Sequence, residues 1–233
     1  MSFHPEKCSI LRVHRKRSPT VHDYKLKGHT LETEDCTKYL GLNICTNLSW
    51  DTHISKIAKK GNSTLGFLRR NLRISSEETK ARAYNALVRP QLEYCSTVWN
   101  PYTKTHIRRL EMVQRRAARY VTKRYHNTSS VTSMLEDLGW ETLESRRTKA
   151  QLTMMYKIVN NLVDIQADSY LTPSNRSTRT SNNRNFTQIS TSTSYYKFSF
   201  FPRTITEWNK LPSSIVEAPD LVSFKQGLST VFS

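Results

Sequence analysis

The chain has 233 residues and carries 36 Lys and Arg against 19 Asp and Glu, a formal net charge of +17 at pH 7. Hydrophobic residues make up 36% of it and aromatic residues 10%, a composition that excludes a disordered tail. No apolar run approaches the roughly 20 residues that a membrane-spanning helix needs. A protein this basic usually meets a polyanion, so we expect nucleic acid, and no membrane, as its partner.

The four cysteines, Cys8, Cys36, Cys45 and Cys95, include no closely spaced pair of the kind that holds zinc. We therefore expect four reduced thiols in an intracellular protein, nuclear or cytoplasmic, with no metal and no other cofactor.

The first 48 residues have the alternation of short strands. Residues 7–14 and 21–27 alternate on either side of a Ser18-Pro19 turn, which predicts an antiparallel hairpin. Residues 38–45 then form an apolar run that contains Gly41. Glycine inside a strand often marks a bulge or a place where something approaches the backbone closely.

Helical periodicity begins at Trp50 and continues to about residue 124. The first helix has an apolar stripe of Ile54, Ile57, Ala58, Gly61, Leu65 and Leu68. Ser75 and Glu78 form a capping box that opens a second helix, with an inner face of Ala81, Tyr84, Leu87 and Val88, and Pro90 should kink or end it near Arg89. A third helix, residues 105–123, has the apolar seam Ile107, Leu110, Val113, Ala117 and Val121.

The remaining residues predict three further parts. Residues 127–171 contain two helices, at 131–138 and 143–162; residues 172–195 form a polar linker or loop; and residues 196–233 form an aromatic-rich tail with a last helix at 221–232. We expect this tail to fold back on the helices. The predicted fold class is α+β and mostly α: a small N-terminal antiparallel β-hairpin plus a strand (1–48), a helical bundle (49–126), the helical extension and the mixed tail.

Catalytic patterns are missing from the sequence. Two-metal nucleotidyl transfer needs carboxylates held together, and there is no Asp-Asp pair. Glu77-Glu78 stands at a predicted helix start, where it favours the helix dipole, and Glu34-Asp35 lies in a polar loop. No P-loop or GxSxG motif is present. We expect no catalysis by this chain alone.

Several motifs in order carry a resemblance to a known family. KYLGLNICTNLSWDTHISKIAKKGNSTLGFLRRNL (38–72), VRPQLEYCSTVWNP (88–101) and IRRLEMVQRRAARYV (107–121) resemble LINE-type, non-LTR retrotransposon reverse transcriptases of the Jockey and CR1 kind. FHPEKCSILRV at the start, where the family usually has Asn-Pro for His4-Pro5, and TSSVTSMLEDLGWETLESRR and SFFPRTITEWNKLP near the end extend the resemblance over nearly the whole chain.

The resemblance implies a part of such a polymerase downstream of its catalytic palm. Tyr39, Leu40 and Gly41 match the primer grip, Lys7 matches a lysine near the incoming nucleotide, and residues 51–124 match the thumb, which holds the template–primer duplex. The catalytic aspartates, which would use Mg²⁺, lie upstream of Met1 in the family. The expected function is therefore template–primer binding without catalysis, by a truncated copy or partial gene product, with the upstream part of the polymerase as a further partner.

Basic residues between positions 56 and 124 are the expected contacts. They bind phosphates without sequence preference, to an RNA–DNA hybrid or template–primer duplex. Besides Lys7, the candidates are Lys56, Lys59, Lys60, Arg69, Arg70, Arg108, Arg109, Arg115, Arg116 and Arg119. The bland alternative is that these side chains form the solvated faces that any helix bundle has. We expect the four tryptophans to be core residues.

Two other functions stay open at this point. The chain could be a non-enzymatic interaction protein whose aromatic tail, residues 195–208, docks a partner and is exposed in the free chain. It could also be the product of a decayed element, without a function.

Overall fold

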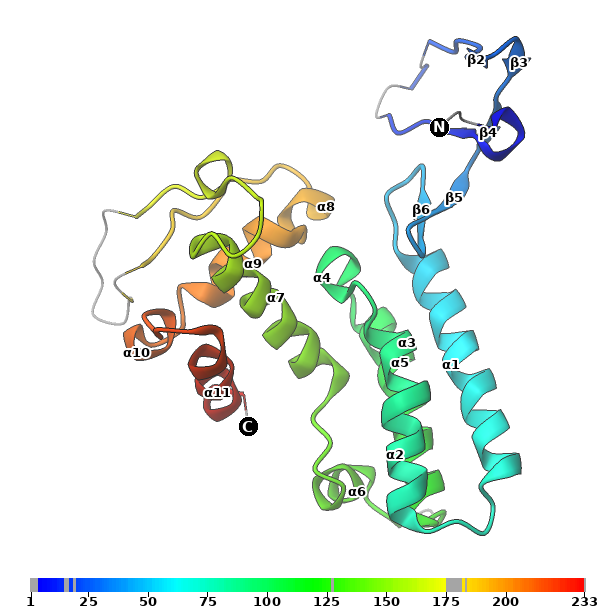
Figure 1. Ribbon diagram of the computed structural model, residues 1–233, viewed down its shortest axis with the longest axis vertical. Helices are drawn as coiled ribbons and strands as arrows, with labels where there is room; N and C mark the ends of the chain where they lie inside the picture. The colour runs from blue at the N-terminus through cyan, green and yellow to red at the C-terminus, as the bar shows by residue number, and fades with distance from the viewer. Residues whose placement is uncertain are drawn as a thin grey trace. The chain divides into compact units, whose positions relative to one another are not determined.

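A computed structural model describes residues 4–14, 17–18, 20–126, 128–174, 182 and 184–232. The chain forms two compact units, residues 1–59 (the N-terminal unit) and residues 60–233 (the C-terminal unit), and helix α1 (Asp51–Asn71) belongs to both. Short strands come first and helices follow (Figure 1). The predicted fold class, α+β and mostly helical, is confirmed.

The N-terminal unit contains three two-stranded pairings. Strands β1 (Ser9–Leu11) and β4 (Glu32–Glu34) are parallel, β2 (Lys25–Leu26) and β3 (His29–Thr30) are antiparallel, and so are β5 (Cys36–Tyr39) and β6 (Leu42–Cys45). A short 3-10 turn, Pro5–Lys7, precedes β1.

The predicted hairpin between residues 7–14 and 21–27 is wrong. Residues 25–26 fold back on residues 29–30 instead, and β1 pairs with β4. The reason is local turn chemistry: Lys27 and Gly28 both have positive φ, 52° and 79°, which is the geometry of a two-residue hairpin turn. Pro19, half of the turn expected from the sequence, lies outside the described residues.

The C-terminal unit begins with the second half of α1 and a group of four helices. These are α2 (Glu77–Leu87), α3 (Arg89–Glu93), α4 (Ser96–Trp99) and α5 (Lys104–Thr122). As predicted, a break in the helix precedes Pro90, which stands in the first turn of α3, where its missing N–H costs nothing. Gly61 allows α1 to pack closely, because a Cβ there would come within 3.0 Å of Leu92 and 3.4 Å of Val113.

Helix α2 differs from its prediction in two ways. Its N-cap is Ser76, whose hydroxyl accepts from the Thr79 N–H, and not Ser75. Its inner face is Lys80, Tyr84 and Val88, whereas Leu87 is 49% exposed. Tertiary contacts determine which face of α2 is buried. The Tyr84 ring stacks on Trp140 with a centroid distance of 4.4 Å, and the Tyr84 hydroxyl donates to Gln114 of α5. The same burial, with Lys123 nearby, lowers the pKa of Lys80.

Further helices complete the C-terminal unit: α6 (Val131–Asp137), α7 (Leu143–Val159), α8 (Ser194–Lys197), α9 (Phe200–Trp208), α10 (Ser213–Val216) and α11 (Leu221–Val231), with a 3-10 turn at Ala167–Ser169. In Figure 1, α7 runs between the α4–α5 region and the tail helices α9 and α11. The carboxylate of Glu111 in α5 accepts from the Glu144 N–H at 2.8 Å and so caps α7.

The C-terminal tail folds back on the helices, as predicted. Its apolar residues and those of α7 form one core, built around Leu152, Tyr156, Ile205, Trp208 and Phe224. The polar segment before the tail also contributes, since the Asn182 amide donates to the Trp208 carbonyl at 2.9 Å. This packing buries Trp208 completely and leaves Tyr195 and Tyr196 about half exposed. Trp99 and Trp140 are buried too, and Trp50 is half-buried, in keeping with core roles.

A buried polar cluster joins α4, α7 and α9. The Arg147 Nε donates to Asn100 Oδ1 at 3.1 Å, and the Asn100 amide donates to Gln151 Oε1 at 2.8 Å. Arg203 donates to the carbonyls of Asn100 and Pro101 at 3.0 and 3.1 Å. Asn100, at the end of the VWNP motif, is therefore the hydrogen-bonding centre of this part of the fold.

Candidate nucleic-acid interface

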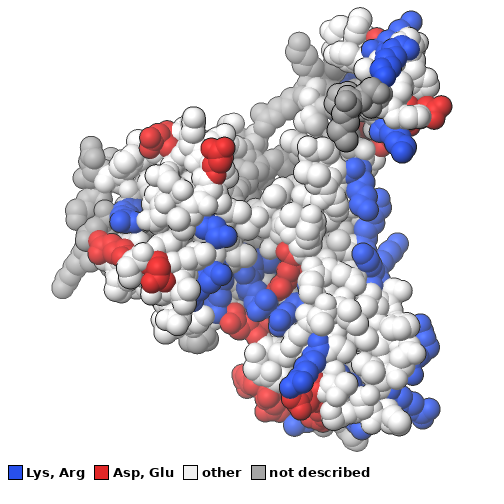
Figure 2. Space-filling view, viewed as in Figure 1, with Lys and Arg blue, Asp and Glu red and all other residues white. Residues whose placement is uncertain are grey.

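The exposed face of α1 carries most of its cations. Ile54, Ala58, Gly61, Leu65 and Leu68 are buried, and the positions on the opposite side of the helix are Lys56, Lys59, Lys60, Ser63, Phe67 and Arg70. We call the four cations of that set the α1 stripe. Between Asp51 and Glu77 the sequence has no acidic residue. Figure 2 shows basic side chains along the outer edge of α1, and the surface there has one sign of charge.

Helix α5 has a similar face. Leu110, Val113, Ala117 and Val121 are buried as predicted, and Arg108, Arg115 and Arg119 lie on the opposite side, seven and four residues apart. We call these three the α5 stripe. The predicted arginine pairs therefore do not act as pairs, because neighbours in a helix point about 100° apart. Arg109 and Arg116 lie on the flank of α5.

That flank contacts α1. Arg116 Nη1 donates to Asn62 Oδ1 at 3.0 Å, and the Tyr120 hydroxyl donates to the Leu68 carbonyl at 3.0 Å. Arg69 is seven residues after Asn62, so it lies on the same side of α1 as Asn62 and not on the α1 stripe. Arg116 is thus engaged in helix packing as well as being exposed.

Several basic side chains form ion pairs with acids, and most of the candidate cations on α1 and α5 do not. The ion pairs join Arg82 with Glu78, Arg89 with Glu93, Arg124 with Asp137, Arg146 with Glu93, Lys149 with Glu141 and Lys210 with Glu207. Within the described part of the chain, no ion pair involves Lys59, Lys60, Arg69, Arg70, Arg108, Arg115 or Arg119. Their charge is not neutralised within the described fold.

The predicted primer-grip residues form the tip of the β5–β6 hairpin. Tyr39 pairs with Leu42, so Leu40 and Gly41 are the two turn residues, with φ of 45° and 88°. Gly41 is therefore in a turn and not inside a strand. Tyr39 is 62% and Leu40 73% exposed. A leucine with positive φ is unfavourable by about 1–2 kcal/mol, and strain of this kind often marks a functional position.

We expect Leu40→Asn to stabilise the hairpin, because asparagine tolerates positive φ and Asn-Gly is the preferred two-residue turn. The gain should be about 0.5–1 kcal/mol. Thermal melting followed by circular dichroism measures it, with Val21→Asn as the control, since Val21 is also exposed but has negative φ. A lower melting temperature for Leu40→Asn would contradict the turn geometry.

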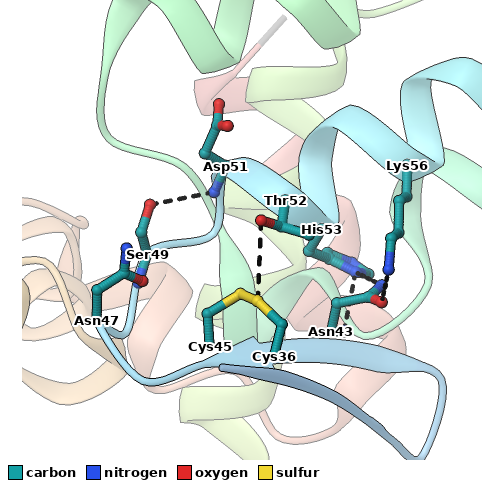
Figure 3. Close-up of a disulfide and its surroundings, with 9 residues drawn as sticks. All are labelled: Cys36, Asn43, Cys45, Asn47, Ser49, Asp51, Thr52, His53 and Lys56. Atoms are coloured by element: carbon teal, nitrogen blue, oxygen red, sulfur yellow. Dashed lines mark hydrogen bonds between the residues drawn. A yellow bond between two sulfur atoms is a disulfide. The ribbon is translucent and has the colours of Figure 1, made fainter. Parts of the chain in front are cut away.

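A disulfide between Cys36 and Cys45 closes the other end of this hairpin (Figure 3). The prediction of four reduced thiols is wrong here; Cys8 and Cys95 remain free. The two residues are nine apart in sequence, but the register places them directly opposite. Because the pair at the turn is hydrogen-bonded and the pairs alternate, Cys36 and Cys45 form a non-hydrogen-bonded pair, in which the side chains are closest.

The hairpin packs on the first turns of α1 within the N-terminal unit. Lys56 donates to Asn43 Oδ1 at 2.8 Å, and the Asn43 amide approaches His53 Nδ1 at 3.3 Å, as Figure 3 shows. Burial and the neighbouring Lys56 lower the pKa of His53, which favours the neutral acceptor form. Lys56 therefore supports the hairpin, unlike the other cations of the α1 stripe.

Lys7 lies in a different setting from the helical cations. It is exposed at the end of the 3-10 turn and lines a cavity of about 320 Å³ together with Glu6, Glu32 and Glu34. Three carboxylates at one cavity disfavour a phosphate there.

Phe67 and Arg73 were missed by the reasoning from sequence. Phe67 is 54% exposed among the cations of the α1 stripe, and Arg73 is exposed just after α1 ends. Phe67 is seven residues after Lys60 and so falls on the same face of α1 as the cations; this spacing could have identified it from the sequence. Exposed aromatic rings among cations are typical of surfaces that contact bases or sugars.

Neither a metal site nor a membrane span is found in the described ranges: no group of three His, Cys, Asp or Glu side chains could hold an ion, and no helix is long and apolar enough to cross a bilayer. Comparisons of the chain with protein-family models, with curated proteins and with solved structures find no match.

Proposed function

We propose that this chain binds template–primer nucleic acid, an RNA–DNA hybrid or a duplex, through its phosphates and without sequence preference. In this proposal it is the C-terminal part of a LINE-type RNA-directed DNA polymerase. The catalytic aspartates and their Mg²⁺ belong to the upstream part of the polymerase, which is then a partner, and the chain does no chemistry alone.

The observation that carries the proposal is the unneutralised charge of the two stripes. A solvated helix face in an ordinary bundle mixes both signs, as α2 does with Glu78 and Arg82. The exposed faces of α1 and α5 instead present cations in rows along rigid helices. Rows of this kind can neutralise several phosphates and gain affinity by releasing counterions from the nucleic acid.

The hairpin tip supports the primer-grip part of the proposal. Tyr39 and Leu40 are apolar, exposed and held in a strained turn, an arrangement that lowers both stability and solubility in the free chain. Contact with a primer end would account for it. Gly41 gives a ligand access to the backbone, since it has no side chain.

Salt dependence tests the proposal directly. We expect the affinity for an RNA–DNA hybrid to fall steeply with salt, and the double variant Lys59→Gln/Arg70→Gln, which removes two cations of the α1 stripe, to reduce the log–log slope by about 1.8, or 0.9 for each phosphate contact. Fluorescence anisotropy at several salt concentrations measures both. The matched control is Arg82→Gln/Lys210→Gln, which removes the same charge from two ion-paired positions and should keep nearly the wild-type slope.

No binding by the wild type at low salt would refute the proposal, and so would equal slope losses in the two double variants. The aromatic-tail alternative predicts a complex with a protein that is insensitive to salt. Because Trp208 is buried, Tyr195 and Tyr196 are the most exposed aromatic residues that the tail offers such a complex.

A further inference from the structure

A cavity of about 430 Å³ lies along one side of α7 in the C-terminal unit, and no residue of either stripe lines it. One wall is a face of α7 from Arg146 to Lys157, whose lining residues are three and four positions apart. The other wall is α11, from Lys225 to Ser229. At 1.5 Å per residue, the α7 wall is about 16 Å long. We call this cavity the α7–α11 groove.

The groove is basic. Its charged side chains are one acid, Glu141, and four bases, Arg146, Lys149, Lys157 and Lys225. Arg146 is held by Glu93, and Lys149 by Glu141 at 2.8 Å. Lys157 and Lys225 stand on opposite walls and form no ion pair with the residues that the structure describes. The groove is therefore lined by two lysines whose charge no acid of the described residues neutralises.

Apolar side chains lie between these lysines. Ala150 and Met154 of α7 and Leu228 of α11 line the same groove. Its volume is in the range of sites for small ligands, about 300–1,000 Å³. A ligand that fits has negative charges on its edges and apolar surface between them, which describes a strand of nucleotides. A cavity of about 430 Å³ has the volume of a small-ligand site and is too small to enclose a duplex.

We propose that the α7–α11 groove binds a single-stranded segment of nucleic acid, with phosphates at Lys157 and Lys225 and sugars or bases against Ala150 and Met154. The inference rests on the proposed function, because a template–primer has an unpaired template strand beyond its duplex. It adds a second site with a different preference: the α1 and α5 stripes lie on exposed helix faces, and the groove has the volume for a single strand.

The test uses the full chain, an oligothymidylate and an RNA–DNA hybrid. We expect Lys157→Gln/Lys225→Gln to reduce the salt slope for the oligothymidylate by about 1.4, or 0.7 for each contact to a single strand, and to leave the slope for the hybrid unchanged. Ser229→Glu, which adds a negative charge to the exposed wall and removes no lysine, should weaken the same ligand selectively. Arg82→Gln/Lys210→Gln is the control of equal charge.

Three results overturn the inference: an unchanged slope for the oligothymidylate, equal losses for the two ligands, or a polyglutamate peptide that binds more tightly than the oligothymidylate and depends on the same two lysines. Failure of the proposed function is distinguishable from these, because it appears as a hybrid affinity that does not depend on Lys59 and Arg70. Single-strand binding that depends on Lys157 and Lys225 supports the groove in either case.

Discussion

Asn100→Ala should destabilise the C-terminal unit by about 2–3 kcal/mol, because it removes a hydrogen bond to the buried guanidinium of Arg147 and leaves Gln151 without its donor. Asn100 Oδ1 accepts from Arg147 Nε, and the two other guanidinium nitrogens of Arg147 have no hydrogen-bond partner in the described part of the chain. Burial already lowers the pKa of Arg147. Asn100 thus supplies the one side-chain hydrogen bond that the structure gives this cation.

A double-mutant cycle isolates this interaction. Arg147→Met should cost less than Asn100→Ala, since a methionine of similar length fills the space without a charge. Asn100→Ala combined with Arg147→Met should cost less than the sum of the two single variants, because the double variant leaves no buried guanidinium without its hydrogen bond. Urea denaturation followed by circular dichroism measures the free energies of unfolding. If Asn100→Ala cost less than about 1 kcal/mol, Arg147 would have to be solvated, contrary to its burial.

Trp208→Ala should cost about 3–5 kcal/mol, the usual range for removing a fully buried aromatic side chain. Trp208 contacts the aromatic rings of Phe224 and Phe186 in the core shared by α7 and the tail, and its indole N–H donates to the Arg184 carbonyl at 2.9 Å. For a chain of this size the melting temperature should fall by on the order of 10 °C. Phe67→Ala is the control, since Phe67 is half exposed, and should change stability by less than about 0.5 kcal/mol.

The same variant separates the two binding sites. Helix α11 forms one wall of the α7–α11 groove, and the Trp208–Phe224 contact helps to hold it on α7. Above the melting temperature of the tail, single-strand binding should be lost. Hybrid binding should persist, because the stripes on α1 and α5 do not use the tail core. Loss of both activities at one temperature would show instead that the C-terminal unit unfolds as a single cooperative block.

Much of the helical part follows from the sequence alone. Local sequence patterns determine four features: the buried stripe of α1, the buried seam of α5, the break before Pro90 and the start of α7. Each depends on residues three and four apart or on a single capping or helix-breaking residue. The net charge and the acid-free stretch of α1 are likewise sequence properties. The expectation of cations on exposed helix faces therefore needed no coordinates.

Long-range contacts decided the rest. The pairing of β1 with β4 depends on which strands meet, and several short strands of similar composition fit more than one partner; the Cys36–Cys45 disulfide depends on the register of one local hairpin. Whether Lys80 or Leu87 lies on the buried face of α2 depends on how α2 packs against Trp140 and α5. Which cations are neutralised, and that Lys157 and Lys225 face one groove, depends on the packing of α11 against α7. Periodicity reports a residue's neighbours along one helix, whereas pairing and cavities arise only when distant segments meet.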